Sequence, residues 1–221
     1  LAALFISIER RTADALLPLD LFRSRTLTTG VGLAVLGGAA RASTFVLVAL
    51  YLQQALAMAP EKAGLAMVPT SLAGFAFSLM VLPRIIRALG AQRSLIAGLV
   101  VLAAGHLWLG HANTGQGYAV AVLPGLLAVA VGVALSFTPT TMVIASAVPD
   151  THTGLASGLA GSATQVGAAL GIATFTAIGI SVGGPIGHTL GTTGFTAAFT
   201  AAAVVALATA ALGSTIARRQ H

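Results

Sequence analysis

The stretch that decides the fold is Tyr118–Val148, YAVAVLPGLLAVAVGVALSFTPTTMVIASAV, which contains no Asp, Glu, Lys or Arg. A helix needs about 20 mostly apolar residues to cross the hydrocarbon core of a bilayer, so this stretch is long enough to span it. Pro124 and Pro139 are expected to trim or kink the helix. Apolar and polar residues do not alternate along the stretch, which argues against a strand of a membrane β-barrel.

Five further stretches of the chain have the same apolar character. They are Leu27–Leu52, Ala63–Leu82, Ser94–Leu109, Gly154–Val182 and Phe195–Ala217. The sequence therefore predicts an all-α, polytopic transmembrane helical bundle of about six spans within residues 27–217. Residues 1–26 are interpreted as the end of a preceding helix and a cytoplasmic linker, and residues 218–221 as a cytoplasmic tail. Because the sequence starts at Leu1 and not at methionine, a fragment or a processed chain is expected.

The composition supports a membrane protein and excludes several other classes. Of the 221 residues, 57% are hydrophobic and only 7% are charged, whereas soluble domains carry about 25% charged residues. The absence of cysteine excludes disulfides, thiolate metal sites and a cysteine nucleophile. The net charge of +6 is scattered through apolar sequence and does not form the basic face of a nucleic-acid-binding protein.

The distribution of Lys and Arg predicts how the bundle is oriented in the membrane. Nine of them fall on one side of the predicted spans, and Lys62 alone falls on the other. The nine are Arg10, Arg11, Arg23, Arg25, Arg84, Arg87, Arg93, Arg218 and Arg219. Cytoplasmic loops carry the excess of Lys and Arg. The chain is therefore predicted to cross the cell membrane several times, with the loop Pro83–Arg93 and the C-terminus on the cytoplasmic side.

Two similar helix starts indicate an internal repeat. Pro60–Ala66 opens the second span and Pro149–Ala156 opens the fifth; each has a proline and an acid before Gly-Leu-Ala. Any helix start could carry such a pattern. The two spans nevertheless hold the same place in consecutive groups of three and run in opposite directions, which is typical of a 3+3 inverted repeat in secondary transporters.

The remaining Arg, Arg41, lies near the centre of the first predicted span, where a charged residue is costly. Its helical face includes Thr44 and Tyr51 and is small or polar for much of its length, so it is expected to face protein or water. All five Asp and Glu residues fall at span ends. Arg41 must therefore meet water, backbone carbonyls, an anionic substrate or an acid from sequence outside this chain. Arg41, Thr44 and Tyr51 are candidates for a substrate pathway.

The fifth span is nearly smooth, because it carries the small-residue pairs Gly154-x-x-x-Gly158 and Gly167-x-x-x-Gly171. Such surfaces allow helices to approach closely in lipid. Gln165 is the exception, and is interpreted either as an interhelical hydrogen-bonding residue or as a further substrate-pathway candidate.

One catalytic motif occurs in the sequence. Gly179–Gly183 matches G-x-S-x-G with Ser181 as the nucleophile, but no strand precedes it, and the nearest acid in sequence, Asp150, lies at the far end of the same helix. A chance match is favoured, and no enzyme activity is predicted. The five histidines show no metal-ligand spacing, and neither a metal nor an organic cofactor is expected.

The order of motifs resembles one family. Leu19–Arg25 before a span, Tyr51–Gln54 at its end, Leu123-Pro124-Gly125, and Gly154–Gly158 continuing through Gln165 and Gly171 are similar to the last six helices of the fourteen-helix drug:proton antiporter branch of the major facilitator superfamily. Residues Pro83–Arg93 resemble a degenerate copy of that superfamily's cytoplasmic G-x-x-x-D-R-x-G-x-R-R motif. Gly90 and Arg93 match, whereas Pro83 replaces the first glycine and Arg87 stands at the aspartate position.

The resemblance implies export of drugs or other small amphipathic compounds by alternating access, with H⁺ as the coupling ion. It also implies membrane lipids, a small-molecule substrate and the missing N-terminal half of the same transporter as partners, and no nucleic acid. The gating-loop candidates that it supplies are Arg84, Gly90 and Arg93. Two alternatives are a six-helix intramembrane hydrolase using Ser181 and a non-transporting membrane scaffold or half-transporter subunit.

Overall fold

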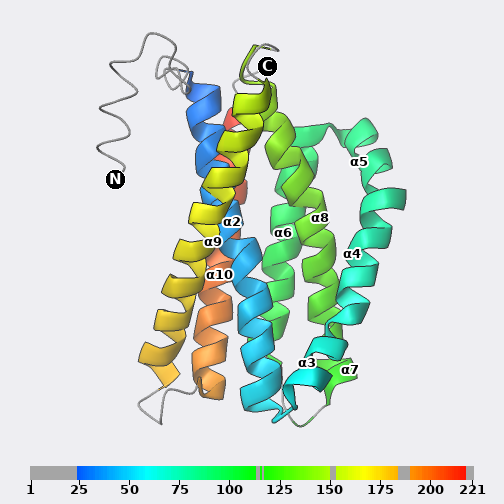
Figure 1. Cartoon of the computed structure of the whole chain (residues 1–221), viewed down its shortest axis with the longest axis vertical. Helices are drawn as coiled ribbons and strands as arrows, with labels where there is room; N and C mark the ends of the chain where they lie inside the picture. The colour runs from blue at the N-terminus through cyan, green and yellow to red at the C-terminus, as the bar shows by residue number, and fades with distance from the viewer. Residues whose placement is uncertain (1–23, 113–114, 116, 150–152, 184–189, 218–221) are drawn as a thin grey trace.

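The computed structural model describes residues 24–112, 115, 117–149, 153–183 and 190–217, and these residues form helices and short connections without a strand. The elements are α2 (Arg25–Leu50), the π-helical turn η2 (Tyr51–Ala55), α3 (Pro60–Ala66), α4 (Val68–Met80), α5 (Leu82–Leu89), α6 (Ala91–Gly110), α7 (Tyr118–Ala121), α8 (Leu123–Ala145), α9 (Thr153–Gly183) and α10 (Thr192–Ala217). The long helices stand side by side in one bundle (Figure 1).

Six helical segments within the described residues are long and apolar enough to cross a membrane. They are Arg25–Ala55, Pro60–Met80, Ala91–Gly110, Tyr118–Ala145, Thr153–Gly183 and Thr192–Thr215. Each coincides with one of the six predicted spans, with ends that differ by a few residues. The all-helical, polytopic fold is therefore confirmed.

Prolines explain where the helices are interrupted. A proline has no N–H to donate to the carbonyl four residues earlier, and its ring clashes with that carbonyl. Three interruptions each lie two residues before a proline: Met67 before Pro69, Val81 before Pro83, and Val122 before Pro124. Pro139, in contrast, lies inside α8, which continues through it.

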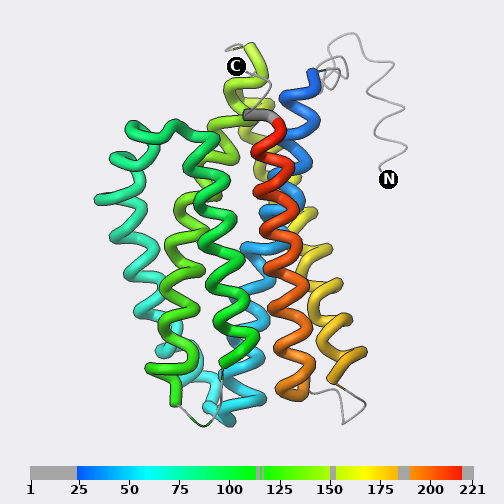
Figure 2. The backbone as a smooth tube through the Cα atoms, turned by 180° about the vertical axis from the view of Figure 1, so that it is seen from behind, coloured from blue at the N-terminus to red at the C-terminus, as the bar shows by residue number. Residues whose placement is uncertain are grey.

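The packing of the helices follows the predicted inverted repeat. The groups α2–α4–α6 and α8–α9–α10 start at opposite ends of the bundle, as the chain colouring shows (Figure 2). In the repeat α2 corresponds to α8, α4 to α9 and α6 to α10. The α2–α9 contact then has the α8–α4 contact as its counterpart, and the α6–α8 contact has the α10–α2 contact; all four are present. The symmetry is incomplete, because α9 also packs on α10 whereas α4 makes no comparable contact with α6.

The prediction of a loop at Pro83–Arg93 is wrong, because most of this segment is helical. Helix α5 covers Leu82–Leu89, and α6 already begins at Ala91. Leu82 is buried, whereas Arg84 and Arg87 are exposed on the opposite side of α5. This amphipathic spacing stabilises a short helix at the end of the bundle. Two arginines within a few residues are also common in loops, so the sequence alone does not reveal this helix.

The small residues of the fifth span divide into two classes. A Cβ added at Gly167 or Gly171 would collide with the backbone of Val35 or Ala39 on α2, whereas none of Gly154, Gly158 and Gly161 has an atom within 4 Å of such a Cβ. The second glycine pair therefore permits the close α2–α9 approach, and the first pair lies on an open face.

Candidate substrate site

Arg41 lies in α2 with only 4% of its surface exposed. Its Nη1 donates a hydrogen bond of 3.4 Å to the Ser136 hydroxyl on α8, and its Cζ lies 5.6 Å from the ring centre of Phe137 on the same helix. The guanidinium curls back along α2, because a Cβ added at Gly37 would lie 2.7 Å from Nη1. Gly37 thus provides the space that the buried guanidinium occupies.

The charge of Arg41 is not neutralised within the described residues. Its Nε and Nη2 have no hydrogen-bond partner there. The one carboxylate among these residues belongs to Glu61, which is exposed near the N-terminus of α3. An unpaired buried charge is strongly unfavourable, and proteins pair such groups or place them at functional sites. Arg41 therefore marks a site that the described part of the chain leaves incomplete.

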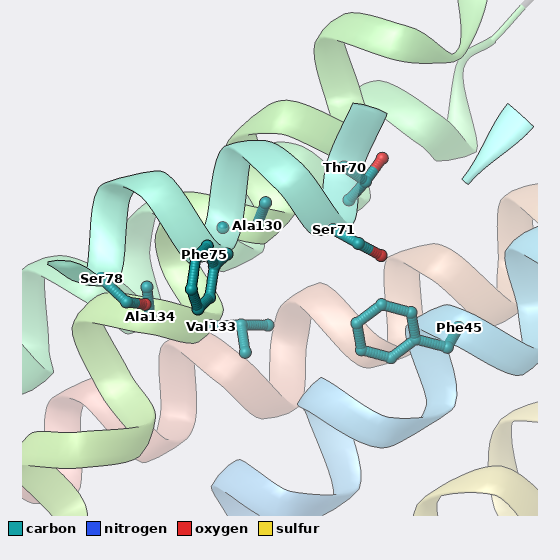
Figure 3. Close-up of a pocket in the computed structure, with 9 residues that line it drawn as sticks. Phe45, Thr70, Ser71, Phe75, Ser78, Ala130, Val133 and Ala134 are labelled. Carbon is teal, nitrogen blue, oxygen red and sulfur yellow. The ribbon is translucent and has the colours of Figure 1, made fainter. Parts of the chain in front are cut away.

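A pocket of about 190 Å³ lies between α2, α4 and α8. Its lining consists of two phenyl rings, three hydroxyl side chains and small apolar residues: Phe45, Thr70, Ser71, Gly74, Phe75, Ser78, Ala130, Val133 and Ala134. In Figure 3, side chains from α4 face those of α8, and Phe45 of α2 lies at one end. Apolar walls with a few polar groups are typical of sites that bind small molecules.

Thr70 places an unsatisfied hydroxyl in the wall of this pocket. The side chain is 2% exposed, and its Oγ1 has no partner among the described residues. A helical threonine commonly donates to the carbonyl four residues earlier. Here that carbonyl, of Ala66, accepts the hydroxyl of Tyr118. In Figure 3 the hydroxyl points away from the other labelled side chains of the pocket, so it is a buried, unpaired polar group behind the pocket wall.

The pocket and Arg41 lie along the same seam between α2 and α8. Phe45 follows Arg41 by one helical turn on α2, and Phe137 follows Val133 by one turn on α8. The guanidinium itself lies further along α2, beside Gly37, and contacts Ser136, which follows the pocket residue Val133 on α8.

Thr44, a predicted pathway residue, pairs with His106 of α6, which the sequence reasoning missed. The Thr44 hydroxyl lies 2.5 Å from Nε2 of His106, both side chains are fully buried, and Nδ1 of His106 has no partner among the described residues. The signal that could have identified His106 was an isolated titratable residue within a predicted span.

Tyr51 and Gln165, the other pathway candidates, lie away from Arg41. The Tyr51 hydroxyl donates to the carbonyl of Ala112 at 3.2 Å, and its ring packs edge-on against Phe195 at 5.2 Å. Gln165 is exposed on α9, so the structure does not bring it beside the α2–α8 seam. The pathway roles of both residues stay predictions.

The gating-loop candidates gather around the turn between α5 and α6. Arg84 is exposed on α5 and donates to the carbonyl of Met80. Gly90 has a φ of +80° between the two helices, a conformation that favours glycine. Arg93 is exposed in the first turn of α6. The three candidates therefore lie around the corner between α5 and α6, and their gating role stays a prediction.

The G-x-S-x-G motif lies inside a helix. Ser181 is exposed near the end of α9, and its hydroxyl donates to the carbonyl of Ile178 at 2.9 Å. A nucleophile elbow requires a strand-to-helix turn, which this segment does not provide. The other members of a possible triad, His188 and Asp150, lie outside the described residues. No group of three or more His, Asp or Glu side chains in the described part could hold a metal ion.

Comparison with known proteins identifies the relatives of this bundle. The chain is 31% identical over 166 residues to the multidrug resistance protein Stp of Mycobacterium tuberculosis, 29% identical over 168 residues to the lincomycin resistance protein of Streptomyces lincolnensis, and 29% identical over 166 residues to the cephamycin export protein CmcT of Amycolatopsis lactamdurans. The chain is a homologue of drug-resistance and drug-export proteins. This finding confirms the resemblance to the drug:proton antiporter branch of the major facilitator superfamily.

The similarity covers most of this chain but a minor part of each relative. The matched residues make up 75–76% of the chain and 30–34% of these three relatives. The chain thus spans about a third of the length of the proteins that it matches. No protein-family model matches it. The six apolar spans and these homologues make this exporter homologue a multi-pass membrane protein.

Proposed function

We propose that this exporter homologue is part of a secondary active transporter that exports drugs or other small amphipathic compounds across the cell membrane. The observation that carries the proposal is the pocket between α2, α4 and α8, which is lined by helices of both groups of the inverted repeat and lies along the seam that contains Arg41. Secondary transporters bind their substrates near the membrane midplane at such repeat interfaces. The relatives' names, which describe resistance and export, support the same function.

Alternating access needs a second group of helices that moves against this one. Two spans, Pro60–Met80 and Thr153–Gly183, are much less buried than the other four. They expose large apolar side chains: Leu65, Val68, Leu72, Phe75, Leu79 and Met80 on the first, and Val166, Leu170, Ile180 and Val182 on the second. These faces fit contacts with lipid and with the N-terminal half of the transporter, which would complete the central cavity.

Coupling to H⁺ is the energy source that we propose. Among the described residues, Glu61 alone carries a carboxylate, and it lies in the first turn of the Pro60–Met80 span, at the end of the bundle. The proton-carrying acid is therefore placed in the rest of the transporter. The nine-to-one distribution of Lys and Arg supports a cytoplasmic position of α5 and of the C-terminus.

Efflux of a neutral amphipathic dye, Nile red, tests the export function in cells that express the complete protein containing this chain. Gly74→Leu fills the pocket, because the added side chain grows toward Ala130. We expect efflux to fall at least fivefold at unchanged membrane abundance. Gly64→Leu is the matched control, since no atom lies within 4 Å of an added Cβ there, and it should stay within twofold of the parent.

Two further measurements separate the parts of the proposal. A protonophore should abolish efflux if H⁺ drives it; efflux that persists would remove the coupling ion and leave export standing. The chain expressed alone should not export the dye, because one half does not enclose a cavity. Export by the chain alone would favour a half-transporter, and equal efflux by Gly74→Leu and Gly64→Leu would remove the pocket from the pathway.

A further inference from the structure

Arg41 combines three properties that together point to a ligand. It is almost fully buried, two of its three nitrogens have no partner among the described residues, and the described carboxylate, Glu61, lies outside the span. The Ser136 hydroxyl, at 3.4 Å, supplies a weak neutral contact that does not balance the charge. The free Nε and Nη2 are adjacent donors of one planar guanidinium, which is the geometry that binds a carboxylate through two parallel hydrogen bonds.

The surroundings of Arg41 specify what must accompany the negative charge. Phe137 lies against the guanidinium and is 49% exposed, so its ring also contributes to the open surface of the seam. Further along the seam, the pocket offers the phenyl rings of Phe45 and Phe75. An apolar cavity of about 150 Å³ holds a benzene ring, so the pocket of about 190 Å³ holds one small aromatic ring system.

We propose that the site selects acidic aromatic compounds: the carboxylate pairs with Arg41 and the ring enters the pocket between α2, α4 and α8. This inference rests on the proposed export function and adds the charge of the preferred substrate. A cation is disfavoured, because its charge would lie next to a buried guanidinium without a described carboxylate between them. A neutral aromatic compound can bind in the pocket, but it leaves the charge of Arg41 unpaired.

Three probes that share one indole ring test the charge preference: indole-3-acetate, its methyl ester and tryptamine. Binding is measured by isothermal titration calorimetry on the purified complete protein at pH 7. We expect the acid to bind at least tenfold more tightly than the ester and the amine. Arg41→Gln should weaken the acid at least tenfold and change the ester by less than twofold. Arg41→Lys keeps the charge but loses the planar fork, so it should retain part of the preference.

Arg87→Gln is the matched control, because it removes an exposed arginine at the end of the bundle and should leave all three affinities unchanged. Wild-type affinities within twofold of one another would overturn the proposal, as would equal weakening of all three probes by Arg41→Gln. If Arg41→Gln does not accumulate, the wild-type comparison and Arg41→Lys still decide. Nile red efflux is measured in parallel: normal efflux without an acid preference rejects this inference alone, whereas absent efflux rejects the export function.

Discussion

The Thr44 hydroxyl lies 2.5 Å from Nε2 of His106 and 3.0 Å from the carbonyl of Ala40, inside the closed seam between α2 and α6. The hydroxyl has one hydrogen to donate. It either donates to the Ala40 carbonyl and accepts from Nε2–H of His106, or donates to an unprotonated Nε2 and only contacts the carbonyl. Nδ1 of His106 has no partner in the described part of the chain. Thr44 therefore provides the one hydrogen bond that the buried imidazole makes there.

Removing the Thr44 hydroxyl should destabilise the bundle. In Thr44→Val the Nε2 atom of His106 loses its described partner, so that neither ring nitrogen is paired within the described residues. An unsatisfied buried polar group costs about 1–3 kcal/mol. Thr44→Ser keeps the hydroxyl and should lie much closer to the parent. The free energy of unfolding, measured by denaturant titration in mixed micelles, checks the difference.

The pair also allows a double-mutant cycle. Replacing both partners with apolar groups removes the unsatisfied polar atoms, so Thr44→Val combined with His106→Leu should be less destabilising than the sum of the single changes. Additive effects would mean that the 2.5 Å contact contributes nothing to stability.

The α2–α9 contact depends on Gly167. A Cβ at this position would strike the backbone carbonyl of Val35, which no side-chain rotation relieves. Gly167→Ala should therefore separate the helices, at about 1–3 kcal/mol for overpacking, and lower both the melting temperature and the membrane abundance. Gly158→Ala, on the open face of the same helix, is the control. Equal melting temperatures for the two variants would contradict the observed packing.

The spans were predictable because hydrophobic length alone specifies them: the predicted Tyr118–Val148 and the observed Tyr118–Ala145 differ at one end. The helix α5 was not predictable in this way. Its amphipathic pattern becomes apparent only when Arg84 and Arg87 are placed on one face of a helix and not in a loop. The sequence also did not show which of the two glycine pairs packs against another helix. Sequence gives Gly154/Gly158 and Gly167/Gly171 the same spacing, and only the neighbouring backbone distinguishes the packed pair from the open one.

The sequence predicted part of the candidate site, namely Arg41, but not the residues that contact it. Arg41 stood out because a charge inside an apolar span is rare, and its small, polar face correctly indicated contact with protein. Its partners Ser136 and Phe137 lie 95 or more residues away in the chain, and no local pattern connects them. The Thr70 hydroxyl is unpaired while the backbone carbonyl one turn before it, of Ala66, accepts the hydroxyl of Tyr118, and no sequence spacing reveals this arrangement.

The orientation of the bundle can be tested with single cysteines, since this chain contains none. Ala88 on α5 and Glu61 on α3 are both exposed and lie at opposite ends of the bundle (Figure 1). A membrane-impermeant maleimide added to intact cells should label Glu61→Cys and spare Ala88→Cys until the membrane is permeabilised. The parent protein provides the background. Labelling in the reverse pattern would invert the proposed orientation and place the C-terminus outside.

The hydrolase alternative makes a separate prediction about Ser181. Its hydroxyl donates to the carbonyl of Ile178 inside α9, so it is neither activated by a base nor presented at a strand-to-helix turn. Ser181→Ala should therefore leave Nile red efflux and membrane abundance within twofold of the parent. Ser157→Ala is the matched control, because Ser157 is also exposed on α9 and donates to the carbonyl of Thr153. A fluorophosphonate probe should label neither serine; covalent labelling that disappears in Ser181→Ala and persists in Ser157→Ala would establish an active nucleophile and revive the hydrolase.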